Sequence, residues 1–303
     1  MPSSLSLRIA SFPPVLVAIV LMIASMAWFS LMNIFIRYVS FEMHTTQIVF
    51  LRNLFSLIIL LPWVLRHGGE ILQTERLQSH FWRGTVGVIG MQLWFYSVAT
   101  LPLNEATALS FTAPIFTTIF AVVFLKEKAG WHRWGAVMIG FAGAMVIIRP
   151  NTETLDPTMF IVLIATSFWA IAGMLVKSLT RTEPANRIVF YMAFIMMLWS
   201  LPAAIYHWQT PDMATLALTF GVAVASTGAH ICLVQSYARA EIVVLMPFDF
   251  FRLVFTALFA YIAFGELADG WTWAGAAIIV SSAAYIAHRE ARKKKHVTQP
   301  LTD

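Results

Sequence analysis

Charged side chains lie inside two long apolar segments of this sequence. Arg52 falls within residues 45–65, and Arg252 falls within residues 241–264 with Asp249 three residues before it. On a helix, that spacing places Asp249 and Arg252 on one face, where they can pair. A charge within a membrane-spanning helix costs about 2.5–3.5 kcal/mol, so it normally faces a polar interior or a partner. The spacing therefore predicts a charge pair that lines a cavity and that an anionic substrate or a proton can separate. The alternative is a self-neutralising pair that serves helix packing.

Arg52 has chemistry of its own, because a guanidinium can hold a carboxylate or phosphate through two parallel hydrogen bonds. Snorkelling of the side chain to the outer headgroups is the alternative. His230 lies in another apolar segment, and its ordinary pKa near neutrality makes it a candidate for proton transfer, or else a hydrogen-bonded packing residue. Glu105 follows Pro102 closely, so it is either a complement to a helix dipole or a protonatable group at the outer mouth.

Further polar and aromatic groups occur at membrane depth. We expect a substrate-binding site formed by Asn33, Arg52, Gln92, Trp94, Tyr96, His230, Asp249 and Arg252. The candidates for proton coupling are Glu105, Asp249 and His230. Trp28, Trp94 and Trp169 can either stack on a planar substrate or simply pack. Gly84, Gly87, Gly90, Gly140 and Gly143 are most simply positions of close helix contact.

Several kinds of chemistry find no support in the sequence. No GxxxxGK[ST] phosphate loop, HExxH or GxSxG motif occurs, so the sequence predicts no catalytic residue and no cofactor. Cys232 is the only cysteine, which excludes an intramolecular disulfide and a cysteine metal cluster. We expect no metal site.

The composition places the chain in a membrane. Hydrophobic residues make up 59 % of the 303 residues and charged residues 12 %, with a mean hydropathy of +0.75. A soluble domain carries about 25 % charge, so this chain could not cover a surface that faces water. Its net charge of +5 is concentrated in short loops and at Ala291–Lys295, which indicates contact with anionic lipid headgroups rather than nucleic acid.

Ten apolar segments are long enough to cross a bilayer as helices. They are residues 15–37, 45–65, 82–101, 104–125, 131–148, 157–177, 185–205, 213–237, 241–264 and 271–288. With the N-terminus inside, 16 of the 20 Lys and Arg residues fall in cytoplasmic segments, whereas Arg37 and Arg149 fall outside. The sequence thus predicts a multi-pass protein of the bacterial inner membrane with both termini in the cytoplasm.

A duplicated segment divides these spans into two sets. Residues 116–127 read FTTIFAVVFLKE and residues 255–266 read FTALFAYIAFGE, an offset of 139. Because each copy belongs to a set of five spans, the second set must enter the membrane in the opposite sense.

Pro114 and Pro247 lie in the fourth and ninth spans, where broken helices would free backbone groups. Arg52 breaks the symmetry, since Met192 stands 140 residues later, and this asymmetry favours a role in substrate binding.

These motifs resemble the drug/metabolite transporter superfamily of the EamA type. The resemblance rests on the FLKE and FGE ends of the repeats, the LPLNEATALSFTAP stretch at Leu101–Pro114 and the MPFDFFRLVF stretch at Met246–Phe255. It implies an all-α membrane protein with ten helices in two inverted five-helix repeats and a central cavity. The segment PFDFFRLVFTALFAYIAFGE is most similar to bacterial carriers of riboflavin or S-adenosylmethionine. Lys126 departs from the family, which more often has Gly before the Glu.

The sequence thus predicts a secondary active transporter that moves a small polar metabolite by alternating access. We expect residues 1–150 and 151–290 to form the two repeats and residues 291–303 to form a basic cytoplasmic tail. Its partners would be a small-molecule substrate and membrane lipid. The sequence is also compatible with a homodimer. A membrane-embedded enzyme that acts on a lipid or isoprenoid is the main alternative, and a channel or structural subunit is a third.

Overall fold

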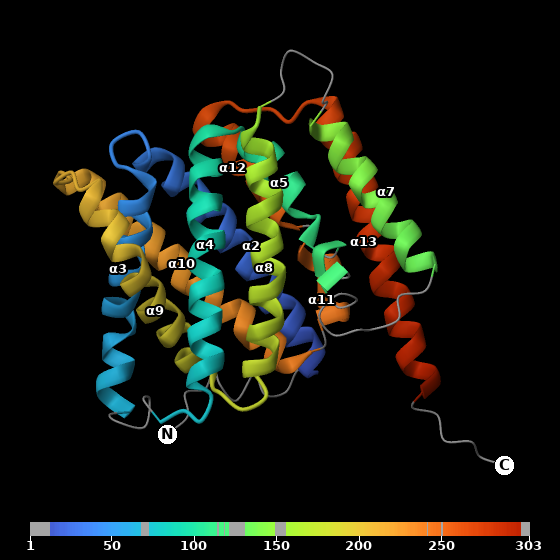
Figure 1. The fold of residues 1–303 in the computed structure, drawn as a ribbon, viewed down its shortest axis with the longest axis horizontal. Helices are drawn as coiled ribbons and strands as arrows, with labels where there is room; N and C mark the ends of the chain where they lie inside the picture. Colours follow the sequence, from blue (N-terminus) through green and yellow to red (C-terminus); the bar gives the residue numbers. More distant parts are fainter. Residues whose placement is uncertain are drawn as a thin grey trace.

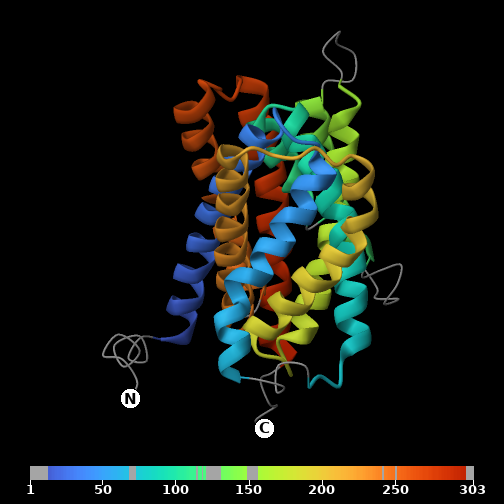
Figure 2. The same cartoon turned by 90° about the vertical axis from the view of Figure 1, so that its left-hand side faces the viewer.

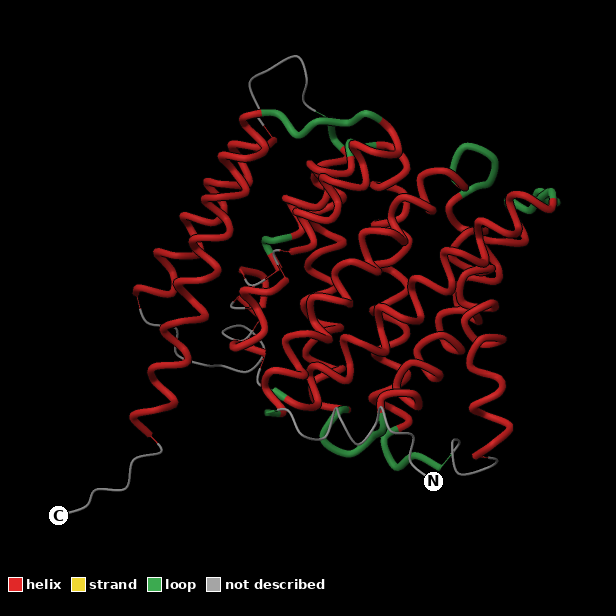
Figure 3. Tube along the Cα trace, turned by 180° about the vertical axis from the view of Figure 1, so that it is seen from behind, coloured by secondary structure: helices red, strands yellow, loops and turns green. Residues whose placement is uncertain are grey.

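A computed structural model describes residues 13–67, 73–113, 115–117, 119–120, 131–148, 156–240, 242–249 and 251–297. The regular elements in these ranges are all helices (Figure 3). The first half contributes α2 (Pro14–Val39), α3 (Thr45–His67), α4 (Leu77–Thr100), α5 (Leu103–Ser110) and α7 (Trp131–Ile148). The second half contributes α8 (Thr158–Leu179), α9 (Ala185–Tyr206), α10 (Met213–Arg239), α11 (Ile242–Asp249), α12 (Phe251–Phe264) and α13 (Gly270–Val297).

The long helices run alternately up and down, side by side in one bundle (Figures 1 and 2). We call the face where α2 begins the lower face and the face where α2 ends the upper face. α2 packs against α10, and α8 packs in the same way against α4. α3 packs against α9, and α7 packs against α13 to one side of the bundle (Figures 1 and 3). The α2–α10 and α8–α4 contacts are thus equivalent, and α3–α9 and α7–α13 each join corresponding helices of the two halves, as an inverted repeat requires.

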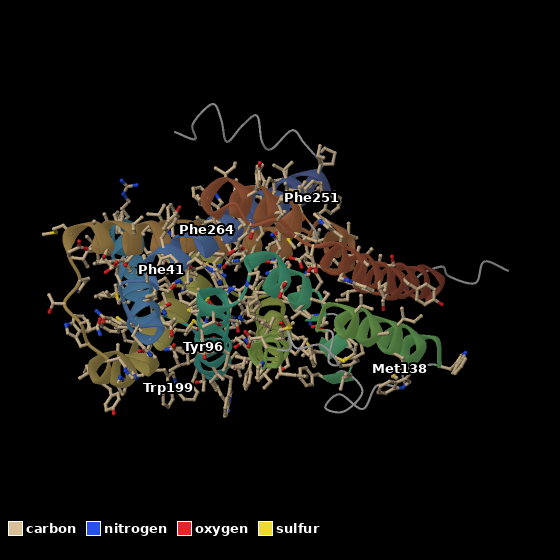
Figure 4. All side chains as sticks on the ribbon, turned by 90° about the horizontal axis from the view of Figure 1, so that it is seen from above. Phe41, Tyr96, Met138, Trp199, Phe251 and Phe264 are labelled. Carbon is tan, nitrogen blue, oxygen red and sulfur yellow. The ribbon has the colours of Figure 1, made fainter. Side chains whose placement is uncertain are left out.

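Five of the described helices meet the length and hydropathy of a membrane span by themselves. They are Pro14–Val39, Thr45–Arg66, Thr158–Leu179, Ala185–Tyr206 and Met213–Arg239, while Met138–Ile147 and Phe251–Phe264 are shorter apolar helices. Large apolar side chains point outward from the bundle, among them Met138, Trp199 and Phe251 in Figure 4. This exposed apolar surface suits lipid, so the chain is an all-α membrane protein.

The fourth span of each half is interrupted. α5 ends at Ser110, and Phe111 and Thr112 form a turn before helix resumes, while α11 ends at Asp249 and α12 begins at Phe251. The hydroxyl of Ser110 donates to the Thr107 carbonyl oxygen and that of Thr112 to the Leu109 carbonyl oxygen, so these side chains supply local hydrogen bonds at the break.

The breaks fall within the spans expected for residues 104–125 and 241–264, the two spans in which the prolines indicated broken helices. Of the two prolines, Pro247 lies within α11, and Pro114 lies outside the described residues. So does Glu127, which ends the first copy of the duplicated segment. α13 continues to Val297, so the expected tail begins as part of this helix.

The contact between α7 and α13 depends on glycine. A Cβ atom on Gly275 would lie 2.7 Å from the carbonyl oxygen of Gly143, and backbone cannot yield easily. We predict that Gly275→Ala destabilises this helix pair by about 1–3 kcal/mol through overpacking. Thermal unfolding in detergent measures the effect. Gly135→Ala on α7 is the control, because a Cβ there would meet nothing within 4 Å, and equal unfolding temperatures for the two variants would contradict the prediction.

Candidate functional site

Arg52 lies at the centre of a polar cluster between α3 and α10. Its position is seven residues from the start of α3, about 10 Å below the upper face, and its side chain is 0 % exposed. Nη1 donates to Oδ1 of Asn53 at 2.5 Å, and Nη2 donates to Oγ of Ser226 on α10. This guanidinium thus points into the bundle, which excludes the snorkelling alternative. Its Nε has no hydrogen-bond partner among the described residues.

His230 extends the same cluster along α10. Its Nδ1 lies 2.8 Å from the carbonyl oxygen of Ser226 and 3.4 Å from Nη2 of Arg52. A carbonyl oxygen can only accept and a guanidinium can only donate, so the two contacts of Nδ1 favour opposite tautomers. The shorter contact, to the Ser226 carbonyl oxygen, favours a proton on Nδ1 and a lone pair on Nε2. The ring of Phe29 meets the imidazole edge to face, with 5.0 Å between the ring centroids.

Arg83 joins the cluster from α4, although the sequence places it among the cytoplasmic residues. The side chain is 7 % exposed and lies close enough to Arg52 and His230 to interact with both electrostatically. Its Nη2 lies 3.3 Å from Sδ of Met192 on α9, and its Nε has no partner in the described part of the chain. The apolar run begins at residue 82, but α4 begins one turn earlier at Leu77, and this places Arg83 inside the bundle.

A second group of buried side chains joins aromatic rings and amides of α2, α4 and α8. Nε1 of Trp94 donates to Oδ1 of Asn33 on α2 at 3.1 Å, and both residues are almost fully buried. The Trp94 ring contacts that of Trp169 on α8 with 4.7 Å between centroids. Oε1 of Gln92 is buried and has no described partner. The structure thus brings together Asn33, Trp94 and Trp169 from three helices.

Arg252 connects the two interrupted spans. Its Nη2 donates to Oγ of Ser110 at the end of α5, and the donor–acceptor distance is 2.6 Å. The guanidinium carbon lies 5.6 Å from the ring centroid of Phe111 and 5.9 Å from that of Trp169, within range of a cation–π contact. Arg252 and Asp249 form no ion pair, because the helix break between α11 and α12 removes the regular three-residue spacing.

Three expected site residues remain to be placed. Asp249 is partly buried at the end of α11 and close enough to Tyr237 for an electrostatic interaction. Tyr96, labelled in Figure 4, is 45 % exposed on α4 and does not join the cluster. Glu105 is partly buried in the first turn of α5, where the helix dipole favours a carboxylate.

Matching cation contacts stabilise the ends of the third helix in each half. At the upper face Nε of Arg37 donates to the Val98 carbonyl oxygen of α4, and at the lower face Nζ of Lys177 donates to the Tyr237 carbonyl oxygen of α10. Arg37 also forms an ion pair with Glu266 from the second half. This corrects its expected position in an outer segment, since Arg37 is buried within α2.

The halves also meet through polar contacts at the lower face. Glu183, between α8 and α9, accepts from Oγ1 of Thr74 and from Nη1 of Arg187. Burial alone would raise the pKa of Glu183, but these hydrogen bonds outweigh it and hold the pKa below its ordinary value. Arg76 donates to the Ser178 carbonyl oxygen at the end of α8. The carboxylate is therefore charged near neutral pH and connects the two halves.

At the upper face, two stacked histidines join α3 to α9. The rings of His44 and His207 have centroids 3.9 Å apart, and Nδ1 of His44 accepts from the backbone N–H of Thr46 at the start of α3. Partial burial and the neighbouring His207 lower the pKa of His44. The contribution of the neutral stack is therefore complete above about pH 6.5 and is lost as the pH falls through this lowered pKa.

We predict that His207→Ala raises the pKa of His44 toward its ordinary value, because the replacement removes the like charge that opposes protonation. Titration of the histidine ring signals by NMR, with His44→Ala used to assign the resonance, measures the shift. An identical His44 titration in wild type and His207→Ala would contradict the interaction.

Comparison with known proteins fits this architecture. The model of the EamA-like transporter family matches residues 16–149 and again residues 156–287, which together form most of the chain. The chain belongs to the EamA-like transporter family. Two matches in one chain agree with the two inverted halves. The family is one of transporters, which supports a transporter rather than an enzyme.

Named relatives of this family member align over nearly their full length. A protein of Rickettsia felis named S-adenosylmethionine uptake transporter is 33 % identical over 87 % of this chain and 90 % of its own. A riboflavin transporter of Vibrio cholerae is 31 % identical over 88 % and 91 %, respectively. A solved crystal structure of another protein superposes with a TM-score of 0.59 at 15 % identity, covering 88 % of this chain and 98 % of that one, and so shares the fold.

Sequence reasoning missed several residues of the cluster. Arg83 and Ser226 belong to the cluster around Arg52, and Ser110 binds Arg252, yet none of the three was expected as a site residue. Serines are common in apolar helices, so the sequence gives no signal for Ser110 or Ser226. The sequence does contain a signal for Arg83, because Gly87 and Met91 follow it at four-residue intervals and so share its face of α4.

Proposed function

We propose that this chain is a secondary carrier that moves a small polar metabolite by alternating access between its inverted halves. The observation that carries the proposal is the polar cluster around Arg52, because it lies at the seam where α3 of one half meets α10 of the other. Rocking of the halves about such a seam would expose the cluster to each side in turn. The interrupted spans supply further polar groups, where Arg252 donates to Ser110.

S-adenosylmethionine is the best-supported cargo, with riboflavin second. The relatives named for these two molecules align over most of this chain. Both molecules contain a planar ring system, which suits the contact between Trp94 and Trp169. S-adenosylmethionine also carries a carboxylate, for which Arg52 offers a complementary charge, whereas riboflavin is neutral.

We further propose that the lower face is cytoplasmic in a bacterial inner membrane, with lipid as the surrounding partner. Arg83 no longer counts toward the loop charges, yet most of the remaining Lys and Arg residues still belong to the lower face.

Reconstitution into proteoliposomes tests the function. Purified protein should show saturable counterflow of radiolabelled S-adenosylmethionine, and empty liposomes provide the background. A flux that rises linearly with concentration would indicate a channel, and the absence of flux for a broad metabolite panel would contradict a carrier.

A further inference from the structure

Two buried arginines contact one face of α4 a helical turn apart, at Gly87 and at Met91. Arg52 and Arg83 interact electrostatically, and neither forms an ion pair with an Asp or Glu of the described residues. Two like charges in an apolar interior are costly unless an anion lies beside them. In a transporter, a mobile anion can take the place of a fixed carboxylate.

Both guanidinium groups keep unused hydrogen-bonding capacity. The Nε atoms of Arg52 and Arg83 are buried and have no partner in the described part of the chain. Arg83 directs Nη2 at the thioether of Met192, and Arg52 shares Nη1 between Asn53 and the thioether of Met91. A thioether sulfur is a weak acceptor, so these donors can form stronger bonds with an oxyanion.

One face of α4 arranges these groups in order. Arg83, Gly87, Met91 and Trp94 follow one another at three- or four-residue spacing, so they share a side of the helix. The guanidinium of Arg83 lies against Gly87, where a Cβ atom would collide with Nη1. Arg52 contacts the same face one turn further on, at Met91. The face thus runs from two cations to the ring of Trp94.

We propose that Arg52 and Arg83 bind the carboxylate of an amino-acid-like substrate whose planar part lies toward Trp94 and Trp169. This inference rests on the carrier function and deepens it by naming the substrate class. His230 contacts Arg52 through Nδ1, and with the proton on Nδ1 its Nε2 is an acceptor that suits the ammonium group accompanying an amino-acid carboxylate. The subsite would select an amino-acid derivative over a neutral molecule such as riboflavin.

Binding measurements on the full chain in detergent test the subsite. The probes are S-adenosylmethionine, decarboxylated S-adenosylmethionine, which lacks only the carboxylate, and riboflavin. Wild type should bind the first about tenfold or more tightly than the second, since a charged hydrogen bond is lost. In Arg83→Met this ratio should approach one. Arg83→Lys should retain part of it, because a lysine keeps the charge but not the planar donors.

Two further variants separate the subsite from the stability of the fold. Gly87→Ala leaves Arg83 in place but displaces its flexible end, so it should reduce the ratio without unfolding the protein. Arg239→Met is the matched control, because this arginine is exposed and, among the residues that the structure describes, donates only to the Gln235 carbonyl oxygen of its own helix. An unchanged ratio in both Arg83→Met and Gly87→Ala would overturn the subsite.

The remaining outcomes distinguish the subsite from the carrier function. Equal affinity of wild type for the two S-adenosylmethionine probes would overturn the subsite. Binding and transport of riboflavin alone would overturn it as well but would leave the carrier function intact. Failure of wild type to bind or transport any of the three probes would count against both.

Discussion

Replacement of Glu266 by alanine is expected to destabilise the protein by about 2–3 kcal/mol and to loosen the upper face. Glu266 forms the ion pair with Arg37, and its Oε2 also accepts from the backbone N–H of Leu103 at the start of α5. Loss of the carboxylate leaves the buried Arg37 without its counter-charge. Removal of one partner of a fully buried pair costs about 3–5 kcal/mol, and this pair lies partly within reach of solvent, so a smaller value applies.

The Glu266 prediction separates charge from hydrogen bonding through a second variant. Glu266→Gln keeps an oxygen that can accept from Leu103 and Arg37, so its unfolding temperature should fall between those of wild type and Glu266→Ala. Glu42 is an exposed carboxylate on the same face, and Glu42→Ala should unfold like wild type. Equal unfolding temperatures for Glu266→Ala and Glu42→Ala would show that the ion pair contributes nothing.

The same contact explains how the halves are joined at the upper face. Glu266 comes from the second half, whereas Arg37, Val98 and Leu103 come from the first. Arg37 holds the end of α4 while Glu266 holds the beginning of α5. Because any rocking of the halves must separate these groups, we expect Glu266 variants to change transport as well as stability.

The helical class and the inverted repeat could be predicted from the sequence because both are properties of a pattern along the chain. Hydropathy identifies long apolar segments, and a duplicated segment with five spans in each half fixes their relative direction. The position of the break within each fourth span was harder to predict from the sequence. Pro247 lies inside α11 and the break follows it at Asp249, so a proline alone does not locate the interruption.

Side-chain partners could be predicted less well than helices. Arg52 is identified from its apolar surroundings, and the structure places it as expected inside the bundle. Asp249 and Arg252 suggest an ion pair by spacing, but that argument assumes a continuous helix. Arg37 and Arg83 lie near the ends of apolar runs, where a sequence cannot distinguish a loop cation from a buried one. Only the packing of α2 and α4 decides these two cases.

Replacement of Arg252 by methionine is expected to reduce transport by about tenfold or more. The variant would lose the charged hydrogen bond to Ser110 and the contacts with Phe111 and Trp169. A charged hydrogen bond contributes about 1.5–3 kcal/mol and a desolvated cation–π contact up to about 2 kcal/mol, so their sum exceeds the 1.4 kcal/mol that corresponds to a factor of ten.

These contacts join the two interrupted spans, so their loss should change the balance between the conformations of the carrier. A contact present in one conformation and absent from another shifts the equilibrium by its own free energy. Arg252 also supplies the carbonyl oxygen that Ser30 of α2 binds, and this backbone contact survives in Arg252→Met. The variant should therefore fold yet transport slowly, with a larger effect on the maximal rate than on ligand affinity.

Variants of the partner residues divide the Arg252 effect into its parts. Ser110→Ala removes the hydrogen-bond acceptor and should cost more than Phe111→Leu, which removes one ring, while neither should match Arg252→Met. Arg252→Lys keeps the charge but loses the planar contact with both rings, so its uptake rate should fall between those of wild type and Arg252→Met. Initial uptake rates in proteoliposomes, normalised to folded protein, measure all four variants. A wild-type rate in Arg252→Met would mean that the two interrupted spans move independently of this arginine.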